Sequence, residues 1–536
     1  MGLSTYFILA ALIFKAVVVG AASASTDGFE NRVRHECGYT MYPALCVDTL
    51  LESSGHRDVV DNNFIISALV NKTILETRLP SSYFSGFISR SLARNDASLQ
   101  RVKSVSDHCV ELLSMAVMRL EQSSQALTSF PTRNKQDIQT WISAALTLQQ
   151  TCKDFSIPAS AADGRLGPGS FGSQLAQKMD YLSQLSSNAL ALINRQSSAT
   201  SHGFGGSKSR GGLPGWVFRR ERKLLQSTVV KANAVVAKDG SGNYKTVSEA
   251  IAAASGGRFV IYVKSGVYKE KIRITKDGIT LIGDGKYSTI IEGDDSVAEG
   301  NSLSGSATIA INGDGFIAKD IGFHNNAGPD RGRAVALTLA SDRSVLYRCS
   351  IAGYQDTLYA LILRQFYREC DISGTVDFIF GNAAAVFQNC DLILRQPGSK
   401  SSYNVILANG RTNPDQNSGF SIQSCRIRGS SGSVRSYLGR PWKPYSRAVV
   451  MQSTIDASVE PRGWIEWPGY GSSVLRTLYF AEYANEGPGA GTAGRVKWGG
   501  FHVIGAEEAV KFTVGSFIAG TSWLPSTGVT FISGLH

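Results

Sequence analysis

The later half of the chain repeats one four-residue phrase, as Arg348-Cys349-Ser350-Ile351, Glu369-Cys370-Asp371-Ile372, Asn389-Cys390-Asp391-Leu392 and Ser424-Cys425-Arg426-Ile427. The first three cysteines are 21 and 20 residues apart. Between them, short runs rich in Val, Ile and Phe alternate with Gly, Asn and Asp turns, which is typical of short strands. A repeat of about 20 residues built from short strands indicates a solenoid. We therefore predict an all-β domain, a right-handed parallel β-helix, over residues 227–536.

Equivalent positions on successive coils of such a fold lie about 4.8 Å apart, the spacing between neighbouring strands. Cys370 and Cys390 should therefore stack, and we predict a disulfide between them. An inner ladder of small apolar side chains is the alternative. It is the preferred interpretation for Cys349 and Cys425.

The same spacing relates two carboxylates. Asp356 and Asp377 are 21 residues apart, and each follows its cysteine, Cys349 or Cys370, by seven residues. They should lie on adjacent coils with their side chains aligned on one face. Two carboxylates that close cannot both ionise easily, so one pKa rises while the other stays low. This pair is the candidate site for acid catalysis and nucleophilic attack.

The first half of the chain is predicted to be an all-α four-helix bundle over residues 26–195. Apolar residues recur there at intervals of three and four, the spacing of one buried helix stripe; one such stripe is Val102, Val105, Cys109, Leu112, Ala116 and Leu120. Cys109 and Cys152 lie on such stripes and are placed to cross-link two helices. Cys37 and Cys46 bracket a Tyr-Pro turn and are placed to close a hairpin. Asn71 begins the sequon Asn-Lys-Thr and is a candidate for glycosylation.

Three features predict export and processing. Residues 1–24 form an apolar run that ends in small residues, as a signal peptide does, although a retained signal anchor is the alternative. Residues 196–226 are predicted to be a linker, because residues 196–215 are rich in Ser and Gly and a basic run, Arg219–Lys223, follows them. An accessible run of this kind in an exported precursor is a protease site, predicted at Arg222-Lys223-Leu224-Leu225.

Composition narrows the partners. The net charge is +11 and the chain has eight cysteines, which suit an oxidising compartment. No Lys/Arg-rich helix face and no zinc-type cysteine spacing is present in the sequence, so nucleic acid is not expected. A basic exported protein is suited to an acidic polysaccharide, although a solvated basic surface without a partner is the alternative.

Several longer motifs in the later half resemble those of the plant pectin methylesterases. They are Gly266-Val-Tyr-Lys-Glu270, Gln355-Asp-Thr-Leu358, Asp377-Phe-Ile-Phe-Gly-Asn-Ala383, Leu438-Gly-Arg-Pro-Trp442 and Gly515-Ser-Phe-Ile-Ala-Gly520. The resemblance runs from about Val235 to the C-terminal region. The first half is similar to the pectin methylesterase inhibitor domain, and the basic word before Leu225 is similar to the family's processing site, where a subtilisin-like protease would act.

The resemblance implies a secreted cell-wall esterase, without metal or cofactor, that acts as a monomer on homogalacturonan. Asp377 would be the nucleophile and Asp356 the proton donor and later the base. Gln355 would stabilise the anionic intermediate. Arg440 would orient Asp377 and contact substrate, and Trp442 would stack on the polymer.

The sequence also departs from the family. Arg333 replaces the glutamine of the family's Gln-Ala-Val-Ala-Leu motif. Its charge would favour an ionised Asp356, while its side chain could still bind substrate. Residues 301–306 differ from the family motif that lines the substrate cleft. The alternatives to an active esterase are therefore a pectin-binding pseudoenzyme, or an inhibitor of other pectin methylesterases acting through the helical half. A calcium-dependent lyase is less favoured, because no dense acidic cluster is present in the sequence.

Overall fold

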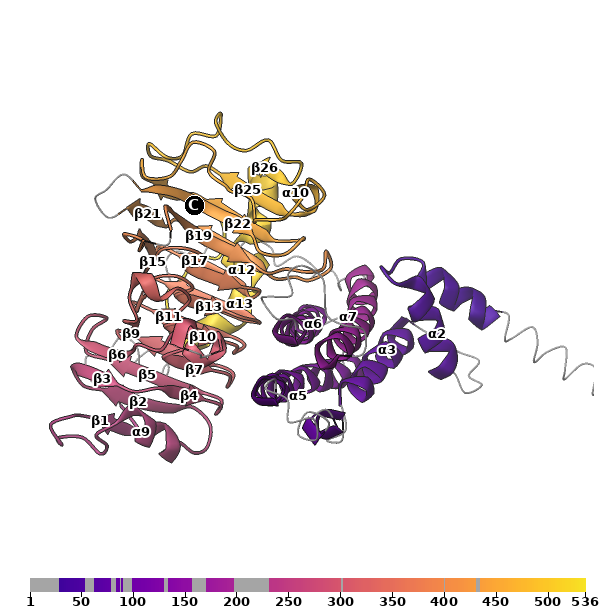
Figure 1. Cartoon of the computed structure of the whole chain (residues 1–536), viewed down its shortest axis with the longest axis horizontal. Coiled ribbons are helices and arrows are strands. Elements are labelled where there is room, and N and C mark those ends of the chain that lie inside the picture. The colour runs from indigo at the N-terminus through magenta and orange to yellow at the C-terminus, as the bar shows by residue number, and fades with distance from the viewer. Residues whose placement is uncertain are drawn as a thin grey trace, which may run out of the picture. The chain divides into compact units, whose positions relative to one another are not determined.

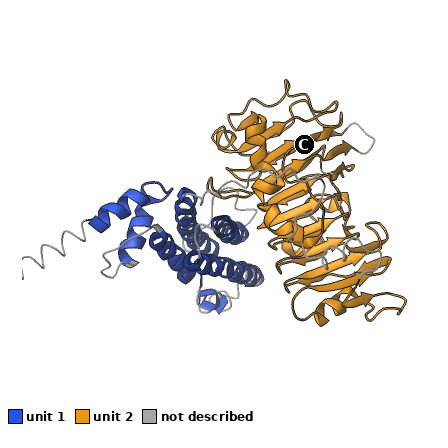
Figure 2. Cartoon of the chain, turned by 180° about the vertical axis from the view of Figure 1, so that it is seen from behind, with its two compact units in different colours: residues 1–203 blue, residues 204–536 orange. Residues whose placement is uncertain are grey.

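The computed structural model describes residues 28–53, 62–78, 83–86, 88–89, 99–129, 134–156, 170–196, 231–299, 302–399, 401–429 and 434–536. The chain divides into two compact units, Met1–Gly203 and Phe204–His536 (Figure 2). The predicted signal peptide and the predicted processing site lie outside the described residues. Within the described ranges, none of the helices combines the length and the apolar character needed to cross a membrane.

The first unit is helical, as predicted. Its helices include α2 (Pro43–Ser53), α3 (Asn62–Thr77), α5 (Leu99–Ser129), α6 (Lys135–Ser156) and α7 (Phe171–Arg195). Helix α5 packs on α6, α6 on α7, α7 on α3, and α3 on α5, which closes a four-helix bundle (Figure 1). The predicted apolar stripe of α5 is buried at Val102, Cys109, Leu112, Ala116 and Leu120.

Both predicted disulfides of this unit are present. Cys37 bonds to Cys46, and Cys109 on α5 bonds to Cys152 on α6. Asn71 lies on the exposed side of α3, where its side-chain oxygen accepts a 2.9 Å hydrogen bond from Ser124. Its glycosylation stays a prediction.

The second unit is a β-helix of three sheets in which the described strands pair in parallel. Sheet A contains β1 (Ala234–Val236), β2 (Phe259–Val263), β5 (Ile279–Gly283), β8 (Ile317–Lys319), β11 (Ser344–Tyr347), β14 (Arg364–Arg368), β17 (Ala384–Gln388), β20 (Gly419–Gln423), β23 (Arg447–Met451), β25 (Tyr479–Tyr483) and β26 (Phe501–Val503). Sheet B contains β3 (Gly266–Lys269), β6 (Thr289–Gly293), β9 (Gly322–Asn325), β12 (Ser350–Ala352), β15 (Asp371–Gly374), β18 (Asp391–Leu394), β21 (Arg426–Gly429) and β24 (Thr454–Ile455). Sheet C contains β4 (Ile272–Ile274), β7 (Ile309–Ile311), β10 (Leu337–Leu339), β13 (Leu358–Ala360), β16 (Ile379–Gly381), β19 (Tyr403–Asn409) and β22 (Arg435–Pro441). From β11 to β22 each coil adds one strand to sheet A, then B, then C, so the predicted β-helix is confirmed.

Short helices cover two parts of the β-helix (Figure 1). They are α9 (Val247–Ala253), α10 (Val474–Thr477), α11 (Ala506–Ala509), α12 (Val514–Phe517) and α13 (Gly520–Trp523), with 3₁₀ turns η2 (Val297–Glu299), η3 (Ser304–Ser306), η4 (Pro329–Arg331), η5 (Val510–Phe512) and η6 (Leu524–Thr527). Helix α9 packs on β1, β2 and β4, the first coils. Phe512, Val514 and Trp523 pack in one apolar cluster with Val345 and Phe366 of sheet A.

The repeated four-residue motif that contains Cys349, Cys370, Cys390 or Cys425 forms the corner between sheets A and B. Its first residue has a left-handed backbone in each copy: φ is 52° at Arg348, 54° at Glu369, 55° at Asn389 and 54° at Ser424. The cysteine that follows turns inward and is buried, with at most 1% of its surface exposed. The motif therefore repeats because these four coils share the same sharp corner, with a small side chain inside it.

The predicted Cys370–Cys390 disulfide is wrong. Cys349, Cys370, Cys390 and Cys425 stack in one inner ladder as free, buried thiols. In-register residues on parallel neighbours are about 4.8 Å apart. The side chains of in-register residues point the same way, so their Cβ atoms are also expected about 4.8 Å apart, beyond the roughly 3.8 Å that a disulfide prefers. Instead the backbone N–H of Cys349 donates to Cys370 Sγ at 3.4 Å.

This ladder predicts the outcome of thiol labelling. Native protein should resist alkylation at all four ladder cysteines, because they are buried. Protein unfolded without reductant should be alkylated at those four positions and not at the two bonded pairs. Peptide mass spectrometry would locate the labels, and protection of Cys370 and Cys390 in unfolded protein would contradict the assignment.

Candidate active site

Asp356 and Asp377 occupy equivalent corners of adjacent coils. Asp356 lies between β12 and β13, and Asp377 lies between β15 and β16; Leu358 pairs with Ile379 in register, two residues beyond each. The backbone N–H of Asp356 donates to Val376 O at 3.0 Å. Both aspartates have left-handed backbones, with φ of 62° and 53°. Asp tolerates this conformation better than most residues do, and here it forms the corner between sheets B and C on both coils.

Arg440 on β22 binds one of the two carboxylates. Its Nε donates to Asp377 Oδ1 at 2.8 Å and its Nη2 donates to Asp377 Oδ2 at 2.6 Å, a bidentate pair that is almost fully buried. Its guanidinium also lies 4.3 Å from the ring centre of Trp467, and Nη1 reaches the Tyr403 hydroxyl at 3.4 Å. These contacts hold the Asp377 carboxylate in one orientation.

The two carboxyl groups therefore differ in pKa. Burial raises the pKa of Asp356 well above its usual range, the neighbouring Asp377 raises it further, and the charges of Arg333 and Arg440 oppose the rise. Burial also raises the pKa of Asp377; Arg440 opposes this through both its charge and its hydrogen bonds, but the net shift is still upward. The expectation that the second carboxyl keeps a low pKa is therefore wrong, because both side chains are buried. Asp377 is therefore the member of the pair that ionises first, and Asp356 is the member that retains the proton.

Gln355 and Arg333 lie side by side on adjacent coils. The two residues form an isolated parallel bridge, and the N–H of Ala334 donates to Gln355 O at 3.1 Å. Gln355 is half-buried and Arg333 is exposed. The sequence placed Arg333 about one coil from Asp356, and the structure agrees.

The second departure from the family lies next to the first. Asn301 is outside the described residues, but Ser302–Ser306 is described and ends in η3. Ser306 is buried and its hydroxyl accepts a 3.3 Å hydrogen bond from the N–H of Val335. The N–H of Val297 also donates to Arg333 O. The altered segment therefore packs on the coil that presents Arg333.

Aromatic side chains surround the pair. Trp442 is half-buried, and its ring meets Phe380 edge to face at 6.0 Å, while Phe380 stacks on Tyr359 at 4.3 Å. Trp467 and Tyr403 were not predicted from the sequence, because neither belongs to the repeat or to a family motif. Together with Trp442 they give the site aromatic surfaces on which a sugar ring can stack.

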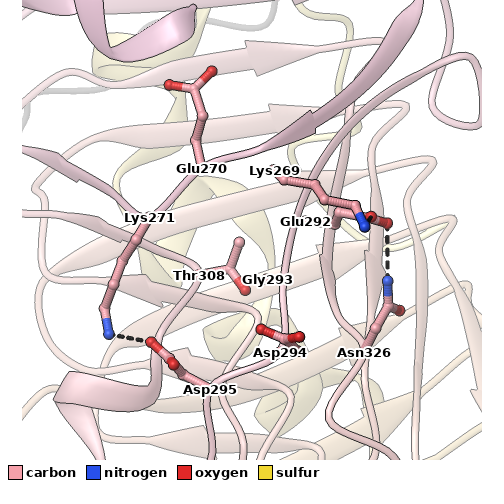
Figure 3. A pocket seen from close by; sticks show the side chains of 9 residues that line it. All are labelled: Lys269, Glu270, Lys271, Glu292, Gly293, Asp294, Asp295, Thr308 and Asn326. Atoms are coloured by element: carbon pink, nitrogen blue, oxygen red, sulfur yellow. Dashed lines mark hydrogen bonds and ion pairs between the residues drawn. The ribbon is translucent and has the colours of Figure 1, made fainter.

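A separate cavity of about 380 Å³ lies at the same B-to-C corner on earlier coils (Figure 3). Lys271 pairs with Asp295, and Glu292 accepts a 2.9 Å hydrogen bond from Asn326 (Figure 3). Glu270 instead accepts from the N–H groups that begin α9. The cavity contains neither Asp356 nor Asp377, so we assign it no part in the chemistry.

Across the described part of the chain, no three His, Cys, Asp or Glu side chains gather as a metal site would need. The site offers two neighbouring carboxyl groups of unequal pKa, with an amide donor one residue away. This set can attack an acyl carbon, stabilise the resulting anion and protonate a leaving group. The fold and site define the chain as a carboxylic-ester hydrolase built on a parallel β-helix.

Comparison with known proteins gives the family. A family model described as Pectinesterase matches residues 233–521, and one described as Plant invertase/pectin methylesterase inhibitor matches residues 31–192. The chain is 45% identical to "Probable pectinesterase/pectinesterase inhibitor 54" of Arabidopsis thaliana, covering 96% of each chain, and 44% identical to "Pectinesterase 2" of Citrus sinensis, covering 98% of this chain and 99% of that one. The solved structure "Pectin methylesterase from Carrot" is 52% identical with a TM-score of 0.56, covering 58% of this chain and all of that one. The chain belongs to the pectinesterase family.

Proposed function

We propose that this protein hydrolyses the C6 methyl esters of homogalacturonan, releasing methanol, through an acyl-enzyme formed on Asp377. The observation that carries the proposal is the difference between the two carboxyl groups. Arg440 donates two hydrogen bonds to Asp377, whereas burial raises the pKa of Asp356 and favours its protonated form. The names of the relatives support the substrate class.

The first half of the reaction transfers the acyl group. The Asp377 carboxylate attacks the ester carbonyl, and the carbonyl electron pair moves to oxygen, where the Gln355 amide donates a hydrogen bond. Collapse of this intermediate breaks the bond to the methoxy oxygen. Asp356 gives that oxygen its proton, and methanol leaves.

The second half releases the acid. Asp356, now a carboxylate, takes a proton from water, and the resulting hydroxide attacks the acyl carbon. Asp377 leaves as a carboxylate, and galacturonate with a free acid group is the product. Arg440 keeps Asp377 oriented through both halves, and Trp442 and Trp467 offer faces to neighbouring sugar units.

A pseudoenzyme is the second candidate, because Arg333 stands where the family has glutamine. Arg333 does oppose protonation of Asp356, yet burial and Asp377 together outweigh it and the pKa remains raised. This balance favours the active enzyme. Methanol release from methylated pectin decides between the two candidates. Release no greater than that of an Asp377→Ala control would contradict the proposed activity.

Replacing Arg333 with glutamine should move the pH dependence upward. Loss of the positive charge raises the pKa of Asp356, so the alkaline limb, where Asp356 loses its proton, should shift to higher pH. The plateau rate should stay within about threefold, because an arginine side chain can also donate hydrogen bonds to the anion. The measurement is the initial rate of methanol release against pH. An unchanged alkaline limb would show that Arg333 does not act on Asp356.

We further propose an extracellular, cell-wall location and a monomeric enzyme, with residues 1–24 as a signal peptide. In this organisation residues 26–195 are an inhibitor-like pro-domain, 196–226 the linker cut at Arg222–Leu225, and 227–536 the catalytic domain. The inhibitor family match over residues 31–192 supports a regulatory role for the helical unit. Suppression of a separate pectin methylesterase by residues 26–195 would support that role, and absence of suppression would contradict it.

A further inference from the structure

Arg395 follows β18 and connects three successive coils. Its backbone N–H donates to Gly374 O at 2.8 Å, on the coil that carries Asp377. Its side chain reaches one coil further, where Nη1 donates to Gly353 O at 2.8 Å and Nη2 donates to the Tyr354 hydroxyl at 2.8 Å. These three contacts connect the coils of Asp356 and Asp377 through one residue.

The same guanidinium also stacks on Tyr354. It lies 3.9 Å from the ring centre, while donating to the hydroxyl of that ring. A planar guanidinium can make both contacts at once, whereas a lysine ammonium cannot. Arg395 is itself held in place, because buried Asn404 donates from its side chain to Arg395 O at 3.0 Å.

The residues to which the Arg395 side chain donates hydrogen bonds come directly before the proposed catalytic groups in the chain. Gly353 and Tyr354 lead into Gln355 and Asp356 without a break. Backbone bonds from Asp356 N–H to Val376 O and from Thr375 N–H to Tyr354 O join this turn to the next coil. Arg395 adds the contacts that fix the Tyr354 ring and the Gly353 carbonyl.

We propose that Arg395 is a positioning residue, which sets the turn bearing Gln355 and Asp356 at its working distance from Asp377. This inference rests on the proposed function. It assigns no contact between Arg395 and substrate. A shift of about 1 Å in a reacting group costs on the order of 100-fold in rate.

The test compares Arg395→Ala with Arg426→Ala in the full-length protein. Arg426 makes a similar two-bond grip, on Asp391 of the same sheet, away from the turn. With Arg395→Ala, kcat for methanol release should fall roughly 10- to 100-fold, because the reacting groups lose their alignment. KM should stay within about twofold, because the residues that bind the polymer are unchanged. Arg395→Lys should recover part of kcat, and Arg426→Ala should keep the wild-type value.

A second measurement does not depend on activity. Hydrogen exchange followed by mass spectrometry should be faster across residues 353–357 in Arg395→Ala than in the wild type or Arg426→Ala. A wild-type kcat in Arg395→Ala, or a raised KM with unchanged kcat, would overturn the positioning role. Unchanged exchange at residues 353–357 would do the same. If Arg395→Ala does not fold, the kcat and exchange of Arg395→Lys decide. Inactive wild type with the expected exchange pattern would overturn the proposed function alone.

Discussion

Asp377→Asn should lower kcat for methanol release by about 10⁴-fold or more, because removing a covalent nucleophile has effects of this order in enzymes that form acyl intermediates. Asparagine keeps the size of the side chain and tolerates the left-handed backbone at position 377. It cannot form the covalent bond by which an ionised carboxylate carries the acyl group. The fall should therefore appear in kcat, with binding of the polymer retained.

The substitution also leaves Arg440 without its anionic partner. Breaking a buried ion pair costs roughly 3–5 kcal/mol in general. A lower melting temperature is therefore expected and must be separated from lost chemistry. Circular dichroism at the assay temperature would establish that the variant is folded. Asp391→Asn is the matched control, because it breaks a similar arginine pair at the surface and should keep wild-type activity. Activity of Asp377→Asn within tenfold of the wild type would exclude this residue as nucleophile.

The β-helix was predictable because its repeat is written directly in the sequence. Four successive coils have one residue with a left-handed backbone at the corner between sheets A and B, followed by a small inward side chain. Arg348, Glu369, Asn389 and Ser424 differ chemically, so the cysteines and the interval between them were the visible signal. The wrong disulfide came from the same signal, because spacing shows that two residues stack but not whether their Cβ atoms approach closely enough to bond.

The carboxylate pair was predictable for the same reason, since Asp356 and Asp377 keep the interval of the cysteines. Tyr403 and Trp467 were not, because they lie where the interval fails. Cys390 and Cys425 are 35 residues apart, so the coil that carries Tyr403 contains an insertion and its register cannot be counted. Trp467 lies beyond the last strands of sheets B and C, outside the repeat.

The net direction of the pKa shift of Asp356 could not be derived from the sequence. Arg333 in the sequence indicated a weakened acid, because its distance from Asp356 could be counted in coils while the burial of Asp356 could not. The structure supplies the missing quantity: only 6% of Asp356 is exposed, and burial is the largest influence on its pKa. The direction of the net shift therefore opposes the effect of the arginine.

Asp356→Asn should lower kcat by about 10²- to 10⁴-fold, the usual worth of a general acid and base. Methanol is a poor leaving group without a proton donor, and the second half of the reaction loses its base as well. The pH profile should change in shape too. In the wild type, acyl transfer slows as pH rises through the raised pKa of Asp356, because the acid loses its proton. The variant has no group to titrate, so its residual activity should lack this alkaline limb and keep the acid limb that Asp377 sets.

Stability should change in the opposite direction to activity. A buried carboxyl whose pKa is raised on folding contributes stability that is complete below the pKa of the unfolded chain and is lost as pH rises toward the folded pKa. Asparagine, which is neutral at every pH, avoids this loss. Asp356→Asn should therefore be at least as stable as the wild type at neutral pH, by an increasing margin from acid to neutral pH. Urea unfolding at several pH values measures that margin. A variant that kept the alkaline limb, or whose stability margin over the wild type did not grow with rising pH, would show that Asp356 is not the buried, protonated acid of the pair.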